Sequence, residues 1–394
     1  MECRCRRRAV RTKAETTRAV HSSVEQGFFE KQSPSSRVKA EIVACYFDIW
    51  GRIITRAPRV EKIVYMDLFA GPGRYEDGSE STPLMVLRRA LRDEGLRAKL
   101  VTIFNDRNRA HIRRLRHCIA ELPGIESLRY APVLLDQEIG QRQAKQLAAT
   151  KLAPTLLFAD PCGLKGLSRE LIAAVLKGFG SECVFFFNYE ALNRCISAPE
   201  AGTVVEDLLG PDESASLQRA LGALRPRERE ERIVSALERS LGRIKGRYVL
   251  RFRFKKSRNR TSHYLVFATK HQLGYGKMKE IMAARSSSAE DGVASFEFDP
   301  TSVGQPALRY EYRRLDRLGH EIAEAFAGQT LTVEDVYERH NVGTPYILTN
   351  YKAAVLRLEQ ASLVTADPPA AERRKDATGA PTLGDSVKIA FPKL

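Results

Sequence analysis

The sequence is poor in paired cysteines, in long apolar runs and in acidic residues, and the first two shortages exclude whole classes of protein. Its 7 cysteines form no C-x-x-C pair, and the odd count argues against a disulfide framework or a structural zinc site. No apolar run reaches the length of a membrane span, and no segment resembles the apolar core of a signal peptide. We therefore expect a cytoplasmic protein with no metal site and no membrane partner.

The shortage of acidic residues leaves the chain strongly basic. It has 64 Lys and Arg residues against 48 Asp and Glu residues, a formal net charge of +16. A surplus of this size favours a polyanionic partner, most often nucleic acid, although an arginine-rich proteome would have the same effect on every protein. With 394 residues, 43% of them hydrophobic, the chain is long enough for two or three globular domains.

The chain is organised around residues 63–75, IVYMDLFAGPGRY. An apolar run predicts a buried strand that ends at Asp67, a glycine-rich turn follows, and Pro83 suits the first position of a helix. Such a corner binds nucleotides in doubly wound sheets, because glycine lets the backbone approach a ligand. Tyr75 replaces the third glycine of the dinucleotide fingerprint, so the turn favours a cofactor without a pyrophosphate. A tight turn with no ligand is the alternative.

The segment D-L-F-A-G-P-G also resembles motif I of class I S-adenosylmethionine (SAM) methyltransferases. The resemblance implies SAM as the cofactor. We expect four residues of this segment to bind it: Asp67, Phe69, Gly71 and Gly73.

Two further apolar strands end in acidic residues that would lie at the same edge of the sheet. Residues 100–106, LVTIFND, end in Asp106, which we expect to bind ribose hydroxyls, with Asn105 as the alternate. Residues 130–136, YAPVLLD, end in Asp136, which we expect near the adenine edge, with the neighbouring Gln137 as the alternative.

A fourth apolar strand ends in Asp160-Pro161, which we predict to be the catalytic residues. This pair resembles the start of the D-P-P-Y-like motif of amino methyltransferases, in which the polar residue and the prolyl carbonyl hold a substrate amine. Cys162 and Gly163 follow, so the aromatic residue that stacks on a flipped base is missing. Pro161-Cys162 also resembles the Pro-Cys pair of cytosine C5 methyltransferases, but the flanking residues of that family are absent.

Two β-rich runs, residues 248–256 and 262–269, predict a hairpin that closes the sheet. Charged helices over residues 200–245 predict an insertion over the crevice. The hairpin is strongly basic, and we expect its cations to contact nucleic acid: Arg251, Arg253, Lys255, Lys256, Arg258 and Arg260.

The pattern changes after about residue 300. Helical runs at 311–327 and 332–340, a third helix that begins at Thr344-Pro345, and a strand at 387–391 predict a winged helix-turn-helix. Tyr351 and Lys352 are the predicted nucleic-acid contacts of the third helix, and a winged helix used for protein contact is the alternative. We therefore predict an α/β chain with a disordered basic tail (1–36), a SAM-methyltransferase-like Rossmann domain (37–290) and a winged helix-turn-helix domain (300–394).

The motif series resembles the three-Cys-motif partner (TcmP) proteins. The matching segments are K-x-E-I-V-x-x-Y-F-x-x-W (39–50), D-L-F-A-G-P-G-R-Y-E-D-G (67–78), F-N-D (104–106), F-A-D-P-C-G-L-K-G-L (158–167), N-Y-E-A-L-N-R (188–194) and H-Y-L-V-F-A-T-K-H-x-L-G (263–274). The resemblance implies a methyltransferase-like core, a winged helix and a partner with a three-cysteine motif, similar to an iron–sulfur radical-SAM-type enzyme. Two functions stay open: a SAM-dependent methyltransferase that acts on or with nucleic acid, or a non-catalytic module that binds nucleic acid or recruits a partner.

Overall fold

The structure is a computed structural model. It describes residues 31–161, 163–196, 202–244, 248–256, 260–301 and 313–393. Most of the predicted basic tail lies outside the described residues, as do Cys162 and Arg258.

An eight-stranded sheet forms the body of the molecule, in the order β10-β6-β7-β5-β4-β1-β2-β3. Strands β1 to β5 are parallel, and β7 runs antiparallel to both β5 and β6. This order confirms the predicted doubly wound sheet with a closing hairpin. The bounds are β1 Ile63–Asp67, β2 Leu100–Asn105, β3 Val133–Leu135, β4 Thr155–Ala159, β5 Glu182–Phe187, β6 Tyr248–Lys256, β7 Arg260–Thr269 and β10 Glu297–Phe298.

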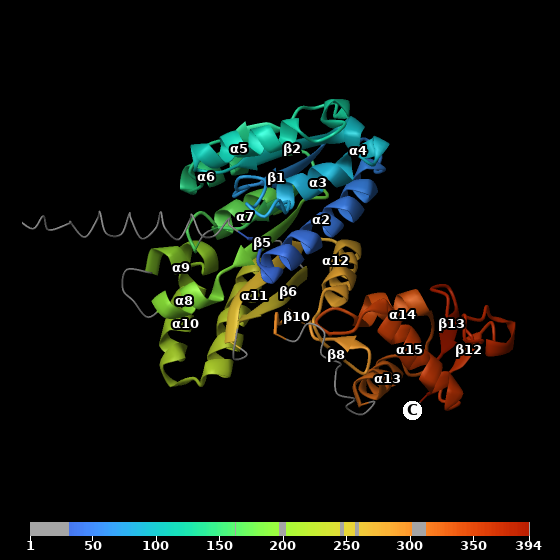
Figure 1. Ribbon diagram of the computed structural model, residues 1–394. Coiled ribbons are helices and arrows are strands. Elements are labelled where there is room, and N and C mark those ends of the chain that lie inside the picture. Colours follow the sequence, from blue (N-terminus) through green and yellow to red (C-terminus); the bar gives the residue numbers. More distant parts are fainter. Residues whose placement is uncertain are drawn as a thin grey trace, which may run out of the picture.

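Helices cover both faces of this sheet and bury two apolar cores. Apolar residues of α2, α3, α5 and α12 fill the first core, and those of α7 to α11 fill most of the second. In Figure 1, α2 lies beside α3 and α12, which it contacts. The bounds are α2 Pro34–Thr55, α3 Thr82–Ala90, α4 Glu94–Lys99, α5 Arg109–Ala120, α6 Gln141–Ala149, α7 Arg169–Leu176, α8 Tyr189–Cys195 and α12 Gln272–Ala284, with a short 3-10 helix η1 at Ile125–Ser127.

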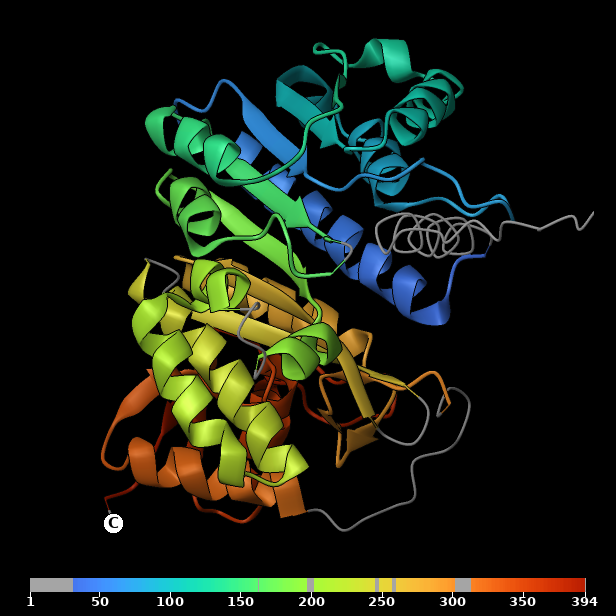
Figure 2. The ribbon, with the colours of Figure 1, turned by 90° about the vertical axis from the view of Figure 1, so that its left-hand side faces the viewer.

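Three helices occupy the segment where an insertion was predicted. Figure 2 shows them as a yellow-green bundle at the side of the sheet. Leu217 of the second helix and Val234 and Leu237 of the third are buried in the core that they share with the sheet. The bounds are α9 Gly202–Leu209, α10 Pro211–Ala220, the 3-10 helix η3 Leu221–Ala223 and α11 Pro226–Arg243.

The C-terminal part folds as the predicted winged helix, with a small antiparallel sheet in the order β11-β13-β12. One boundary differs from the prediction, because the third helix begins at Leu348 and not at Pro345. Thr344 Oγ1 donates to the carbonyl of Asn341 (2.9 Å) and closes the turn after the second helix, so it caps no helix. The bounds are α13 Arg313–Ala325, β11 Thr330–Thr332, α14 Val333–His340, α15 Leu348–Gln360, β12 Thr365–Asp367, η5 Ala370–Glu372 and β13 Lys388–Ala390.

The segment of residues 286–301, which includes the gap between the two predicted domains, is structured. It contains β8 Ala289–Glu290 and β9 Val293–Ala294, which pair with each other, followed by β10. Val293 is buried in the winged-helix core, whereas Phe298 is buried in the core of the large sheet. The segment therefore joins both cores. Across the described ranges, no helix combines the length and the apolar character needed to cross a membrane.

Candidate cofactor site

The predicted glycine turn begins at the carboxyl end of β1. The N–H of Phe69 donates to Asp67 Oδ1 (3.0 Å), which turns the chain sharply after the strand. Gly71 and Gly73 have φ angles of +65° and +89°, a region that favours glycine. At Gly73 an added Cβ would lie 2.9 Å from a methyl group of Leu115, so this glycine is needed for the close packing of α5.

Asp106 lies against this turn, as its place after β2 predicted. Asp106 Oδ2 accepts a hydrogen bond from the N–H of Gly71 (3.0 Å), and Oδ1 accepts one from the N–H of Asn108 (2.8 Å). The carboxylate therefore holds the glycine turn and the start of α5 together. The alternate, Asn105, donates to the carbonyls of Leu68 and Gln137, so its amide ties the ends of neighbouring strands.

Asp67 is the unusual group of the site. It is only 1% exposed, and its Oδ2 has no hydrogen-bond partner within the described part of the chain. The pKa of this carboxyl is raised to about 8, mainly by burial; the nearby charges of Asp160 and Asp106 also raise it, and the bond from the Phe69 N–H lowers it. A buried oxygen with no partner is costly, and a cationic ligand would satisfy it.

Asp160 follows β4 and contacts a side chain that the sequence did not single out. The ammonium of Lys39, on α2, forms an ion pair with Asp160 Oδ2; the Lys39 side chain is 7% exposed. Lys39 Nζ also lies 4.4 Å from the centroid of the Phe186 ring, which stacks on His263 with the centroids 4.6 Å apart. Burial lowers the pKa of His263 to about 4, so this imidazole is neutral at pH 7.

A sequence signal for Lys39 existed. Lys39 stands in register with Val43, Tyr46 and Trp50, at helical spacing on the buried face of α2. A lysine among apolar residues of a buried stripe indicates a partner in the core. His263 gave no such signal, because it reaches the cluster only through the pairing of the hairpin with β5.

The remaining predicted site residues differ in their surroundings. Asp136 directly follows the carboxyl end of β3. Its side chain is 46% exposed and forms an ion pair with Arg109 (2.8 Å). The ring of Phe69 lies so close to Gly166 that an added Cβ there would be 2.9 Å from Phe69 Cζ. Pro161 is buried beside Asp160. The structure thus brings Asp67, Asp106 and Asp160 together and leaves Asp136 at the margin.

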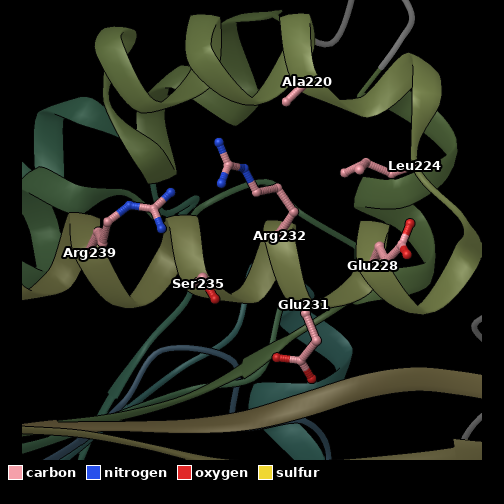
Figure 3. Close-up of a pocket in the computed structure, with 7 residues that line it drawn as sticks. All are labelled: Ala220, Leu224, Glu228, Glu231, Arg232, Ser235 and Arg239. Carbon is pink, nitrogen blue, oxygen red and sulfur yellow. The ribbon is translucent and has the colours of Figure 1, made fainter.

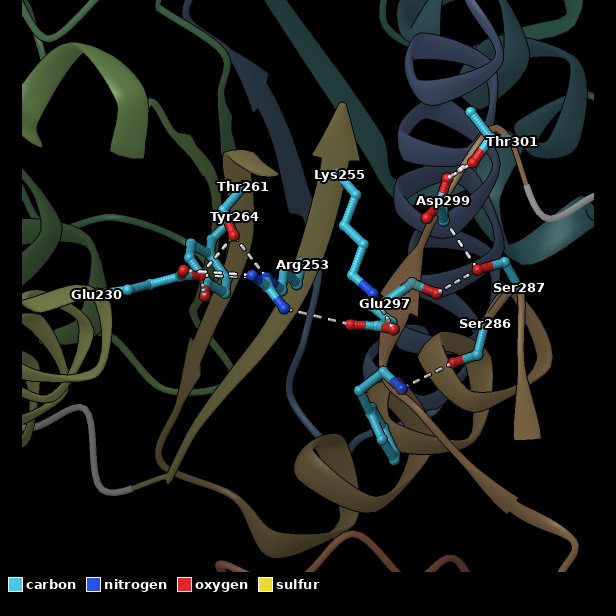
Figure 4. A network of polar contacts seen from close by, with 11 residues as sticks. Glu230, Arg253, Lys255, Thr261, Tyr264, Ser286, Ser287, Glu297, Asp299 and Thr301 are labelled. Atoms are coloured by element: carbon cyan, nitrogen blue, oxygen red, sulfur yellow. Dashed lines mark hydrogen bonds and ion pairs between the residues drawn. The ribbon is translucent and has the colours of Figure 1, made fainter. Parts of the chain in front are cut away.

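The basic hairpin is paired within the chain. Arg251 and Arg253 form ion pairs with glutamates of α11, and Lys255 pairs with Glu297 of β10. Figure 4 shows Arg253 between Glu230 and Glu297. Lys256 pairs with Glu190, whereas Arg260 is exposed at the start of β7. Contact of these cations with nucleic acid stays a prediction.

The third helix of the winged helix requires one correction. Tyr351 is 0% exposed and donates or accepts a hydrogen bond with His340 Nδ1 (2.8 Å), so it belongs to the domain core and offers no surface to a ligand. Tyrosine at helical spacing with apolar neighbours is the core pattern, and the sequence shows that spacing. Lys352 forms an ion pair with Asp385 (2.6 Å).

A pocket of about 420 Å³ lies in the insertion, apart from the cluster around Asp67. Figure 3 shows Arg232 pointing across the gap between the helices, while Glu231 points away from it towards the sheet. None of the predicted site residues lines this pocket. Its lining consists of Ala220, Leu224, Glu228, Glu231, Arg232, Ser235 and Arg239.

Comparison with known proteins supports the class of the fold. Residues 285–371 match the family model described as a GMT-like wHTH domain, which assigns the C-terminal domain as a winged helix. A search of the curated proteins found no match.

Similar solved structures include a protein from Legionella pneumophila (9% identity, TM-score 0.34, covering 59% of this chain and 85% of that one). A predicted O-methyltransferase from Agrobacterium tumefaciens is also similar (13% identity, TM-score 0.29, 58% and 79%), as is the DszA carbon methyltransferase (14%, 0.32, 56% and 51%). Scores this low carry no argument. The strand order and the family model together define a methyltransferase-like α/β body with a winged helix behind it.

Proposed function

We propose that this protein binds SAM at the carboxyl ends of β1 and β2 and acts as a SAM-dependent methyltransferase on or with nucleic acid. The observation that carries the proposal is the unpartnered Asp67 Oδ2, buried at the end of β1 beside a glycine turn. The amino group of SAM is cationic and could donate the hydrogen bond that this oxygen lacks. When bound, SAM would supply a methyl group on a sulfonium.

The residues of the chain would hold and orient the reactants. Asp67 would accept from the amino group, and Asp106 would accept from ribose hydroxyls in addition to the N–H of Gly71. Asp160 would orient the acceptor, because methyl transfer depends on the alignment of the reacting atoms more than on acid–base groups. The neutral imidazole of His263 lies in the same cluster and would add no charge beside the sulfonium.

The resemblance to TcmP proteins leads to a proposal about partners. The matching segments, residues 39–50 and 158–167 among them, include Lys39 and Asp160, which meet in the structure. We propose that the protein acts together with a partner protein that has a three-cysteine motif, similar to a radical-SAM-type enzyme. This partner would be additional to nucleic acid. Copurification of the two proteins from one expression host tests this proposal.

Calorimetry tests the cofactor. We expect heat of binding with SAM and with S-adenosylhomocysteine, and we expect Gly71→Val to abolish it. Gly78→Val is the matched control, because Gly78 also has a positive φ (+82°) but an added Cβ there meets no atom within 4 Å. Both substitutions strain a turn, but only Gly71 lies in the turn that would hold the cofactor. Only the first should therefore weaken cofactor binding. Wild-type protein that gives no heat at millimolar SAM would refute the proposal.

A second candidate function, a non-catalytic binding module, is favoured by one contact. The ammonium of Lys39 already pairs with Asp160, at the position where a substrate amine was predicted. Transfer of labelled methyl groups from SAM to DNA, RNA and the partner protein separates the two candidates. For an enzyme, Asp160→Ala should lower the rate by about two orders of magnitude or more, as expected for misaligned reactants. SAM binding without labelling of any acceptor would support the module.

A further inference from the structure

Helix α5 carries a row of exposed arginines on the outer surface of the body. Ile112, Leu115 and Ile119 are buried, and the helix period therefore places Arg109, Arg113 and Arg116 on one outward stripe. The rise of the helix separates them by about 6 Å and about 4.5 Å along its axis. Arg114 lies beside this stripe and is also exposed.

This row differs from the basic hairpin in its pairing, because in it only Arg109 has a carboxylate partner among the described residues, Asp136. Arg113, Arg114 and Arg116 lie within ion-pair distance of no carboxylate in the part of the chain that is described, whereas Arg251, Arg253, Lys255 and Lys256 all have carboxylate partners. Arginines that are close together and unpaired repel one another and create a positive field. A positive field therefore remains available to a polyanion on α5.

An apolar groove of about 350 Å³ runs beside the row. It lies between α5 and β3, which is the edge strand of the sheet, and Val133 of this strand is 41% exposed. Tyr130, just before β3, has Lys62 Nζ 4.8 Å from its ring centroid and the Arg129 guanidinium at 5.5 Å, which adds two cations to this edge. The groove is lined by Arg116, Ile119, Ala120, Ile125, Pro132 and Leu134.

We propose that α5 and the β3 edge bind single-stranded nucleic acid, with phosphates on the arginine row and the apolar parts of the nucleotides in the groove. The row is one helix wide, which suits a flexible strand of phosphates better than a broad acidic protein surface. In Figures 1 and 2 this surface lies at the opposite end of the molecule from the winged helix. The single-stranded nucleic acid would therefore bind independently of the winged helix.

The direction of the row connects it with the candidate site, and this step rests on the proposed function. Helix α5 begins directly after Asp106, which contacts the glycine turn. A single strand of nucleic acid that follows the row from Arg116 to Arg109 would therefore run towards the carboxyl ends of β1 and β2. The surface would deliver a nucleic-acid acceptor to the cofactor.

Fluorescence anisotropy with labelled single-stranded DNA and RNA of about 16 nucleotides tests the surface. The triple variant R113Q/R114Q/R116Q should bind about tenfold more weakly at physiological salt. The slope of log affinity against log salt should fall in magnitude by about 2, the value for three lost phosphate contacts on a single strand.

The matched control is R219Q/R227Q/R232Q, which removes the same charge from exposed positions of α10 and α11. It should bind as the wild type does. An equal loss in both triple variants would overturn the proposal, because it would reflect net charge alone. Tighter binding of polyglutamate than of oligonucleotide would also overturn it and would indicate an acidic protein partner.

SAM calorimetry on the same proteins keeps the two proposals separate. The α5 triple variant should retain the heat of SAM binding, because none of its substitutions touches Asp67, Gly71 or Asp106. Wild-type protein that binds the oligonucleotide but gives no heat with SAM would refute the proposed function and leave this surface standing.

Discussion

At the scale of single residues, the candidate site depends on side chains held in unfavourable surroundings. Asp67 is buried with one oxygen unpartnered, and burial raises its pKa. Folded proteins rarely retain such a group unless a ligand uses it, because strained or unsatisfied groups cluster at functional sites. The titration of Asp67 therefore provides a test that needs no ligand.

We expect Asp67→Asn to stabilise the protein in a pH-dependent way. The folded pKa of about 8 lies above the ordinary value of 3.8, so the unfolded chain releases this proton first as the pH rises. Wild-type stability should therefore fall from about pH 4 to about pH 8. The asparagine oxygen can still accept from Phe69 but carries no charge. The melting temperature of the variant minus that of the wild type should grow across this window.

Thermal melts in one buffer series between pH 4 and pH 9 measure this difference. A difference that stays constant with pH would show that Asp67 is ionised throughout, and the proposed burial effect would be wrong.

The ion pair of Lys39 with Asp160 leads to a second prediction. Lys39→Met leaves the partly buried Asp160 without its cation and removes the contact with the Phe186 ring, so it should lower the free energy of unfolding by about 1–3 kcal/mol. Arg37→Met is the control on the same helix, because the Arg37 side chain is 73% exposed in its pair with Glu41. Its effect should stay within about 0.5 kcal/mol. Urea unfolding measures both, and equal losses would contradict a special role for Lys39.

The residues of the site could be predicted only where the chain itself brings them to the sheet edge. Asp67, Asp106 and Asp160 each follow an apolar strand, and parallel strands place such positions together. Lys39 and His263 come from a preceding helix and a closing hairpin. Their meeting depends on how these elements pack, which periodicity does not determine.

At the scale of elements, the hairpin shows what strand alternation can and cannot predict. The β-rich run at residues 248–256 predicted one strand of a basic hairpin, and the structure confirms the strand as β6. The same pattern did not show that glutamates of α11 lie against that face. Glu230 lies more than three helical turns before the end of α11, so only the tertiary packing pairs it with Arg253.

We expect Glu230→Ala to destabilise the attachment of α11 to the hairpin. Glu230 is 9% exposed and accepts hydrogen bonds from Thr261 Oγ1 and Tyr264 Oη (both 2.5 Å) while pairing with Arg253 (3.1 Å). Its removal leaves these donors without their acceptor and takes from Arg253 the nearer of its two carboxylate partners, at a cost of about 3–5 kcal/mol.

The neighbouring residue provides the control. The Glu231 side chain is 62% exposed and pairs with Arg251, so Glu231→Ala should cost less than about 1 kcal/mol. Chemical unfolding compares the two variants. Similar losses for both would mean that the buried network contributes nothing beyond a surface ion pair.

At the scale of the whole molecule, the two bodies are held by more than a linker. The predicted domain bounds leave residues 291–299 unassigned, because β8 to β10 are only two residues long each, too short to show a period in the sequence. These strands place Val293 in one core and Phe298 in the other. The turn that precedes α15 also packs on α12, where Gly343 N–H donates to the hydroxyl of Tyr275 (3.2 Å).

Lys279 is the central polar contact between the bodies. It is 1% exposed on α12, and its ammonium nitrogen donates to the carbonyl of Asn341 (2.7 Å) in the winged helix. The other groups around it are the Tyr275 ring, at 5.5 Å, and His340, whose pKa is lowered by burial. None of these supplies a negative charge, so burial lowers the pKa of Lys279 to about 7.

We therefore expect the attachment of the winged helix to strengthen as the pH rises from about 7 towards 10. In this window the unfolded lysine, with its ordinary pKa of 10.5, still holds a proton that the folded lysine has released, so the free energy of unfolding increases with pH. The rise cannot exceed about 1.4 kcal/mol per pH unit, the limit for one proton. Lys279→Met should remove it, whereas Lys277→Met, on the exposed side of the same helix, should retain it. Urea unfolding at a series of pH values measures the rise, and its persistence in Lys279→Met would assign the pH dependence to another group.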